Sequence, residues 1–292
     1  MGNIIIQFYA EDGVGLNGYI HRKQKGNDKI LIQVHGMTSN CFKKRESVIA
    51  NKLDEIGIDS MCFNTRGSEI VKYIKDKSGN KKLAGTAYED IEESYYDLLG
   101  AVKYAIKLGY TNIYLQGHSL GATKVVYFYS KMQKENNEYL KFIKGIVLLS
   151  LVDIPDMIKT YSNIKNIEFA RTKDANGENM DLMPIDSFIH PISIKTFLKY
   201  LDIKDIDFAQ YDNSDYEFEI LNNIDVPIFM RWGNINELIK KTAVKQVELM
   251  NKKIRKSEKD ISYIDGANHS YDGKEDILAS QICTFLSKYI NK

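Results

Sequence analysis

A serine at position 119 lies where the sequence pattern places an exposed nucleophile. It is the centre of Gly117-His118-Ser119-Leu120-Gly121, which follows a short apolar strand and precedes a helix-forming run that continues to residue 131. This pattern is typical of a nucleophile elbow, a tight turn that presents a hydroxyl group at the end of a sheet. Glycines suit such a turn because two backbones pass too closely there for a Cβ atom. The pentad needs its structural context, so the rest of the chain must supply partners for Ser119.

A serine hydroxyl becomes a good nucleophile only beside a base, which is usually a histidine oriented by a third group. His118 lies inside the elbow, where its side chain is expected to point away from Ser119, and His35 ends a predicted strand. His269 follows the last predicted strand and precedes the final helix, in the order nucleophile first and histidine last that this elbow requires. The sequence therefore predicts His269 as the base. The five histidines are His21, His35, His118, His190 and His269.

The group that orients the histidine is expected after the strand at 228–232. Asn236 occupies the position where a carboxylate is typical, and Glu237 follows it directly. A carboxylate offsets the charge of the imidazolium, whereas an asparagine carbonyl only orients the ring. We favour Glu237 as the acid, with Asn236 as a neutral alternative and Asp153, at the end of the preceding core strand, as a third.

Two backbone N–H groups are needed to stabilise an oxyanion. One is expected from Leu120, the residue after the serine, where the helix dipole adds to its effect. The other is expected from Met37, in the turn that follows the third predicted strand.

Apolar segments alternate with helical patterns along most of the chain. Strands are predicted at 4–9, 16–21, 29–34, 58–63, 113–117, 145–152, 227–232 and 261–264, and helices at 43–56, 88–108 and 122–131. This alternation predicts an α/β fold with a doubly wound, mostly parallel sheet of about eight strands and helices on both faces. The first two strands are expected to form an antiparallel hairpin.

Residues 153–225 interrupt the alternation and are too long for a plain connection. We therefore predict a core of 1–152 and 226–292 with an inserted cap or lid at 153–225. Within the insertion, Asn176-Gly177 between two apolar segments favours a β-hairpin of 167–170 with 180–183. We expect its aromatic residues to form a small core rather than an acyl pocket; they are Phe169, Phe188, Phe197, Phe208, Tyr211 and Tyr216.

The composition is that of an ordinary globular protein. Of 292 residues 43% are apolar, and the net charge is +1, so we expect neither a nucleic-acid nor a membrane partner. There is no metal-ligand spacing and no phosphate-binding loop, so neither a metal nor a cofactor is expected. The three cysteines, which are odd in number and far apart, predict reduced buried thiols and a cytoplasmic location. Arg66 and Glu89 are expected near the site or supporting its loops, either as an ion pair with each other or as surface charges.

These motifs together resemble the α/β-hydrolase superfamily of serine hydrolases, and within it a group of small esterase-like enzymes. The resemblance implies hydrolysis of a small carboxylic ester or other acyl substrate through an acyl-enzyme, without a cofactor. Amide or thioester hydrolysis at the same site and a catalytically impaired binding protein are the alternatives. Asn236 is the departure from the family pattern. The resemblance is carried by His35-Gly36, the elbow, Asn268-His269, and the segments 63–67, 85–89 and 121–124.

Overall fold

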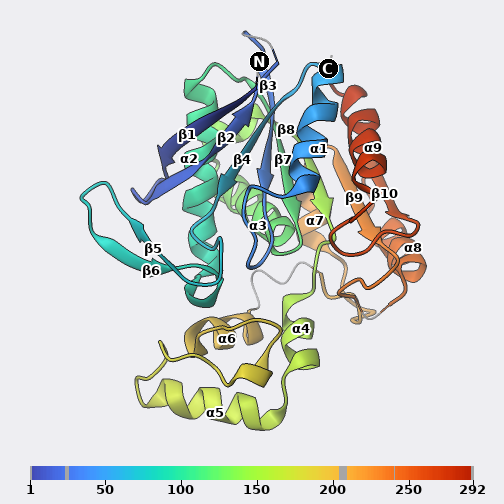
Figure 1. Ribbon diagram of the computed structural model, residues 1–292. Coiled ribbons are helices and arrows are strands. Elements are labelled where there is room, and N and C mark those ends of the chain that lie inside the picture. Colours follow the sequence, from blue (N-terminus) through green and yellow to red (C-terminus); the bar gives the residue numbers. More distant parts are fainter. Residues whose placement is uncertain (1, 24–25, 204–208, 240, 291–292) are drawn as a thin grey trace.

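The computed structural model describes residues 2–23, 26–203, 209–239 and 241–290 (Figure 1). Its main sheet has eight strands in the spatial order β1-β2-β4-β3-β7-β8-β9-β10. β1 pairs antiparallel with β2, and β2 antiparallel with β4, while the remaining pairs are parallel. The predicted α/β sheet and its opening hairpin are confirmed. The strands are β1 (Asn3–Tyr9), β2 (Gly15–His21), β3 (Lys29–Val34), β4 (Asp59–Asn64), β7 (Asn112–His118), β8 (Ile143–Leu149), β9 (Ile228–Gly233) and β10 (Lys259–Ile264).

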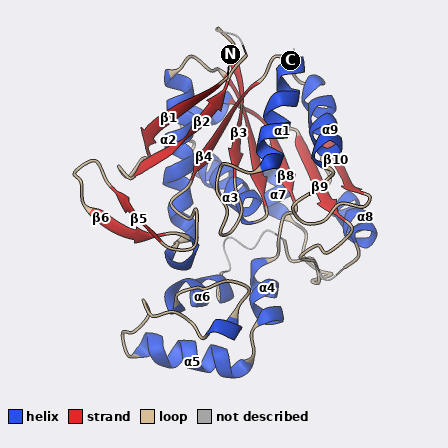
Figure 2. Cartoon of the chain, viewed as in Figure 1, coloured by secondary structure: helices blue, strands red, loops and turns tan. Residues whose placement is uncertain are grey.

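The central strands are buried on both faces because helices cover each side of the sheet (Figure 2). Along β7, Ile113 and Leu115 contact the hydrophobic cluster on one face, and Tyr114 contacts the cluster on the other. The first cluster includes residues of α2 (Ser94–Lys107), α3 (Leu120–Lys134), α7 (Glu219–Asn223) and α8 (Ala243–Lys253), and the second those of α1 (Lys44–Leu53) and α9 (Glu275–Ser287). Successive residues of a strand point to opposite faces, and both faces are buried here, so the central strands are continuous apolar runs.

Short strands and 3₁₀ helices lie outside the main sheet and its helices. A separate two-stranded sheet of β5 and β6 extends from the side of the molecule (Figure 1). Among the described residues, no helix is long and apolar enough to cross a membrane. Cys41, Cys62 and Cys283 are buried free thiols, as predicted. The small elements are β5 (Lys72–Lys75), β6 (Lys81–Ala84) and the 3₁₀ helices η1 (Asp54–Ile56), η2 (Thr86–Tyr88), η3 (Ile91–Glu93), η4 (Glu138–Phe142) and η5 (Ile185–Ser187).

Three helices of the predicted insertion gather beyond one end of the sheet: α4 (Ile154–Tyr161), α5 (Ile164–Ala175) and α6 (Ile194–Leu201) (Figure 1). Phe188, Phe197 and Tyr211 are buried in the hydrophobic cluster that also contains the sheet, so they join the main core rather than form a small core of their own. Phe169 is partly exposed, Tyr216 is half-buried, and Phe208 lies outside the described residues. The boundaries of a cap at 153–225 stay a prediction.

The predicted hairpin around Asn176-Gly177 is wrong, because its first half belongs to α5. Asn163 begins this helix by accepting a hydrogen bond from Asn166 N with its side chain. Asn176 then ends it, and Gly177 adopts a left-handed φ of 78°. The Asn-Gly pair therefore ends a helix. Helix ends and hairpin turns both need a residue that tolerates a positive φ, so the same pair occurs in both.

The start of α3 packs directly against the end of β3. A Cβ atom on Gly121 would lie 2.3 Å from Val34 O and 2.6 Å from His35 O. A Cβ atom on Gly117 would lie 2.2 Å from Gly121 O. Two backbones thus cross at the elbow with no room for a side chain, which is why glycine occupies both positions.

Substitution of Gly121 tests this crossing. We expect Gly121→Ala to lower the free energy of unfolding by about 3 kcal/mol or more, because the carbonyl groups that it meets are backbone atoms that cannot rotate away. Gly177→Ala is the control; it enters open space at a left-handed φ and is expected to cost about 1 kcal/mol. Urea denaturation measures both. Equal losses in the two variants would contradict the close approach at the elbow.

Candidate active site

Ser119 lies between β7 and α3 in a backbone conformation that few non-glycine residues adopt. Its φ is 55° and its ψ is −124°. The turn is held by Ser119 N, which donates to Leu149 O at 2.8 Å, and by Ala122 N, which donates to Ser119 O at 2.9 Å. A strained serine between a strand and a helix is the geometry that the elbow pattern predicts. The residue lines a pocket at the carboxyl end of β7.

His269 lies in the loop that follows β10, and it lines the same pocket as Ser119. Its Nδ1 atom is 2.6 Å from Glu237 Oε2, and the side chain of Glu237 is only 5% exposed. A histidine whose Nδ1–H donates to a carboxylate presents its other ring nitrogen for proton transfer. The structure therefore brings His269 and Glu237 together beside Ser119.

The carboxylate of Glu237 is held from several directions. Oε1 accepts hydrogen bonds from Ser150 Oγ at 2.5 Å and Gly233 N at 3.0 Å, and Oε2 also accepts one from Leu238 N at 3.1 Å. Burial on its own raises the pKa of this carboxyl, but the hydrogen bond and charge of His269 and the bonds from Ser150 and Gly233 lower the pKa below 4.5 overall. Glu237 is thus ionised at neutral pH.

The two alternative partners of His269 lie in other settings. Asn236 is exposed and has a left-handed φ of 51°, so the chain turns at this residue before Glu237. Asp153 Oδ1 caps α4 by accepting from Asp156 N at 3.0 Å. Glu237 is the one of the three residues that hydrogen-bonds the His269 ring in the structure.

His118 supports the histidine loop, a role that its position in the pentad did not reveal. Its Nε2 is 2.7 Å from His269 O, and the two rings lie 4.9 Å apart at their centroids. Burial, with the nearby charges of Arg45 and His269, holds the pKa of His118 well below 6.5. The neutral ring donates from Nε2 to the carbonyl, and it therefore fixes the loop next to the elbow.

The turn after β3 lies against the serine. A Cβ atom on Gly36 would be 3.0 Å from Ser119 Cβ. Thr38 has a left-handed φ of 53°, and its N–H donates to Thr86 Oγ1 at 2.8 Å. The N–H groups of Met37 and Leu120 donate to no other residue in the described part of the chain. Met37 and Leu120 both line the pocket of Ser119, and Thr86, which sequence reasoning did not single out, holds the turn that carries Met37.

The expected pairing of Arg66 with Glu89 is wrong, and so is the alternative that they are surface charges. Glu89 is fully buried and pairs with Lys124 Nζ, on the helix that begins at the elbow. Arg66 is 2% exposed, and its Nη2 lies 2.8 Å from Asp97 Oδ1. Burial selects these pairs, because a charge removed from water needs a nearby partner, and each pair joins a loop of the site to a helix.

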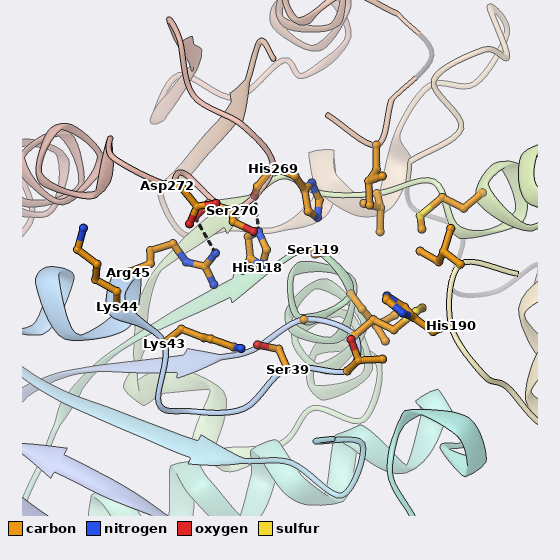
Figure 3. A pocket seen from close by; sticks show the side chains of 18 of the residues that line it. Ser39, Lys43, Lys44, Arg45, His118, Ser119, His190, His269, Ser270 and Asp272 are labelled. Carbon is orange, nitrogen blue, oxygen red and sulfur yellow. Dashed lines mark hydrogen bonds between the residues drawn. The ribbon is translucent and has the colours of Figure 1, made fainter. Parts of the chain in front are cut away.

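The pocket around Ser119 has a volume of about 500 Å³. Figure 3 shows His269 above Ser119 and His118 to its left, with Lys43 and His190 on opposite sides of the serine. No group of three His, Cys, Asp or Glu within the described residues is placed to hold a metal ion. The pocket has an apolar part of Met37, Leu120, Val152, Met157, Ile189 and Leu238, and a polar part that includes Thr38, Ser39, Lys43, Arg45, His190 and Asp272.

Comparisons with known proteins give the fold. No family model matches the sequence, and no curated protein does. Est1E from Butyrivibrio proteoclasticus with bound ferulic acid has a similar structure, with a TM-score of 0.69 and 19% identity over 98% of this chain and 100% of that one. The Pyrococcus furiosus esterase Pf2001 has a TM-score of 0.63 and 19% identity over 99% of this chain and 92% of that one. The α/β hydrolase GrgF from Penicillium sp. sh18 has a TM-score of 0.66 and 16% identity over 100% of both chains. The chain has the α/β-hydrolase fold.

The environment of Glu237 predicts a pH-dependent contribution to stability. A carboxyl whose pKa is lowered by folding stabilises the protein above its ordinary pKa of 4.5, and that contribution is lost as the pH falls through the lowered value. We expect the difference in unfolding free energy between wild type and Glu237→Gln to be constant near neutrality and to shrink below about pH 4.5. Urea denaturation at several pH values measures this difference.

The control is Glu248→Gln, at an exposed position on α8. Its effect is expected to be small throughout this pH range. A Glu237→Gln difference that stays the same between pH 7 and pH 3 would contradict an ionised, stabilised carboxylate at this position.

Proposed function

We propose that the protein is a serine hydrolase that cleaves a small carboxylic ester through an acyl-enzyme. The observation that carries this proposal is the hydrogen bond from His269 Nδ1 to Glu237 Oε2, since His269 lines one pocket with Ser119. A strained serine, a histidine and an ionised carboxylate form the set of groups that acyl transfer requires.

The reaction begins when Ser119 Oγ attacks the ester carbonyl carbon while His269 Nε2 accepts the hydroxyl proton. The oxyanion of the tetrahedral intermediate accepts hydrogen bonds from the N–H groups of Met37 and Leu120, which have no competing partner in the described chain. Glu237 stabilises the imidazolium that forms. His269 then gives the proton to the leaving alkoxide, and the alcohol departs.

A water molecule completes the cycle. His269 takes a proton from the water as its oxygen attacks the acyl carbon bound to Ser119, and the same two N–H groups stabilise the second oxyanion. Collapse of this intermediate breaks the bond to Ser119 Oγ, which recovers its proton from His269, and the carboxylic acid leaves. No step requires a cofactor.

Support for an ester rather than another acyl compound comes from the similar structures, of which Pf2001 is named as an esterase. The pocket, with an apolar wall beside a polar one, suits a small organic substrate that has both apolar and polar parts. The three buried free thiols support a reducing compartment, and we place the enzyme in the cytoplasm.

The nucleophile is tested by labelling and by substitution. We expect a fluorophosphonate probe to modify wild type at Ser119, because the histidine activates this hydroxyl, and mass spectrometry of peptides identifies the site. Ser119→Ala is expected to abolish both labelling and the hydrolysis of 4-nitrophenyl esters. Folded wild type that neither reacts with the probe nor hydrolyses any ester would favour a binding protein instead.

The acid is tested by comparing neighbouring residues. We expect Glu237→Gln to lower kcat by about 10⁴, because the amide cannot offset the imidazolium charge. Asn236→Ala is the matched control; its side chain is exposed, so kcat is expected to stay within a factor of about three. Steady-state kinetics on one ester measures both. The reverse ranking of the two variants would show that Asn236 supports the histidine.

A further inference from the structure

His190 is a pocket histidine that the proposed mechanism does not use. It lies in the loop before α6, is half-buried, and lines the pocket that contains Ser119. Each of the other histidine rings has a hydrogen-bond partner: His21 with Asn3 and Asp54, His35 with Gly36 and Thr65, His118 with His269, and His269 with Glu237. No described residue hydrogen-bonds the ring of His190.

The loop that carries His190 is anchored on both sides. Phe188 is buried and packs edge-on against the ring of Tyr161, with centroids 6.4 Å apart. Ser193 N donates to Ala87 O at 2.8 Å, and Thr196 Oγ1 donates to Glu89 O at 3.2 Å. These bonds tie the loop and α6 to the body of the protein, so the backbone beneath His190 has a defined position. A loop held in this way limits the positions open to the His190 ring, which lowers the entropic cost of recognising a ligand.

The surroundings of His190 favour an uncharged ligand group. Met157, Ile189 and Leu238 line the same pocket, and burial lowers the pKa of His190 below 6.5. A neutral imidazole presents one N–H donor and one acceptor. When an apolar substrate displaces water from this ring, both groups lose their hydrogen bonds, which costs free energy unless the substrate supplies a replacement.

We propose that His190 is a specificity-determining residue that hydrogen-bonds a hydroxyl group carried on the otherwise apolar part of the ester. This inference rests on the proposed esterase function. A hydroxyl group both donates and accepts, so it pairs with either ring nitrogen in either tautomer. A carboxylate would require the charged ring that burial opposes, and Lys43, which has no ion-pair partner among the described residues, lies on the other side of Ser119 (Figure 3).

Two pairs of matched esters test the proposal. Ethyl 3-phenylpropanoate and ethyl 3-(4-hydroxyphenyl)propanoate differ by a hydroxyl on the acyl part. 2-Phenylethyl acetate and 2-(4-hydroxyphenyl)ethyl acetate differ by a hydroxyl on the alcohol part. In one of the pairs, wild type is expected to favour the hydroxylated ester by about tenfold in kcat/KM, the value of one hydrogen bond made in a site that excludes water.

Substitution assigns that preference to a residue. In His190→Leu the ratio of kcat/KM within the pair is expected to fall to about one, whereas His190→Gln, which keeps a donor and an acceptor, retains part of it. His21→Gln, remote from the pocket, is the matched histidine control and should show the wild-type ratio. Each ratio comes from one enzyme preparation, so a change in the folded fraction does not affect it.

The outcomes separate this proposal from the one on which it rests. Hydrolysis of the esters without preference in either pair, or a preference that survives His190→Leu, overturns the role of His190 and leaves the esterase intact. If folded wild type hydrolyses none of the four esters, the role of His190 falls, and the esterase falls with it when the fluorophosphonate probe also fails to label Ser119.

Discussion

The site depends on the close crossing of two backbones at the elbow. Gly117 and Gly121 let the start of α3 pass against the end of β3, and Gly36 lets the neighbouring turn lie against Ser119. Because β3 and β7 are adjacent parallel strands, their carboxyl ends deliver both turns to the same edge of the sheet. The serine and the N–H groups of Met37 and Leu120 are therefore placed together by the sheet itself, before any side chain contributes.

His269 and Glu237 follow β10 and β9, which lie on the opposite side of β7 from β3. β9 and β10 pair in parallel, so the loop that carries Glu237 and the loop that carries His269 begin next to each other. His118, from β7, then donates to the His269 backbone and joins this half of the site to the elbow. Ser150 follows β8, the strand between β7 and β9, and its hydroxyl donates to the Glu237 carboxylate. Adjacent strand ends thus contribute one group each to a connected network of hydrogen bonds.

Sequence patterns predicted the sheet because each buried strand is a short apolar run between helical segments, and they predicted the elbow because its glycines are imposed by backbone geometry. They placed Glu237 near His269 only as a preference over Asn236, since the choice depends on the left-handed turn at residue 236. The pairs of Glu89 and Arg66 were not predicted, because partner choice for a buried charge depends on tertiary packing. Asn176-Gly177 was misassigned since helix ends and hairpins both use residues that tolerate positive φ.

The short segment from residue 85 to residue 89 contacts three parts of the molecule at once. Thr86 accepts from the turn beside Ser119, Ala87 and Glu89 accept through their carbonyl groups from the start of α6, and the Glu89 side chain pairs with Lys124 on the elbow helix. The turn that presents Met37 and the loop that presents His190 therefore share one mechanical support. A displacement of α6 would therefore act on both the His190 loop and the turn that carries Met37, because residues 85–89 contact both.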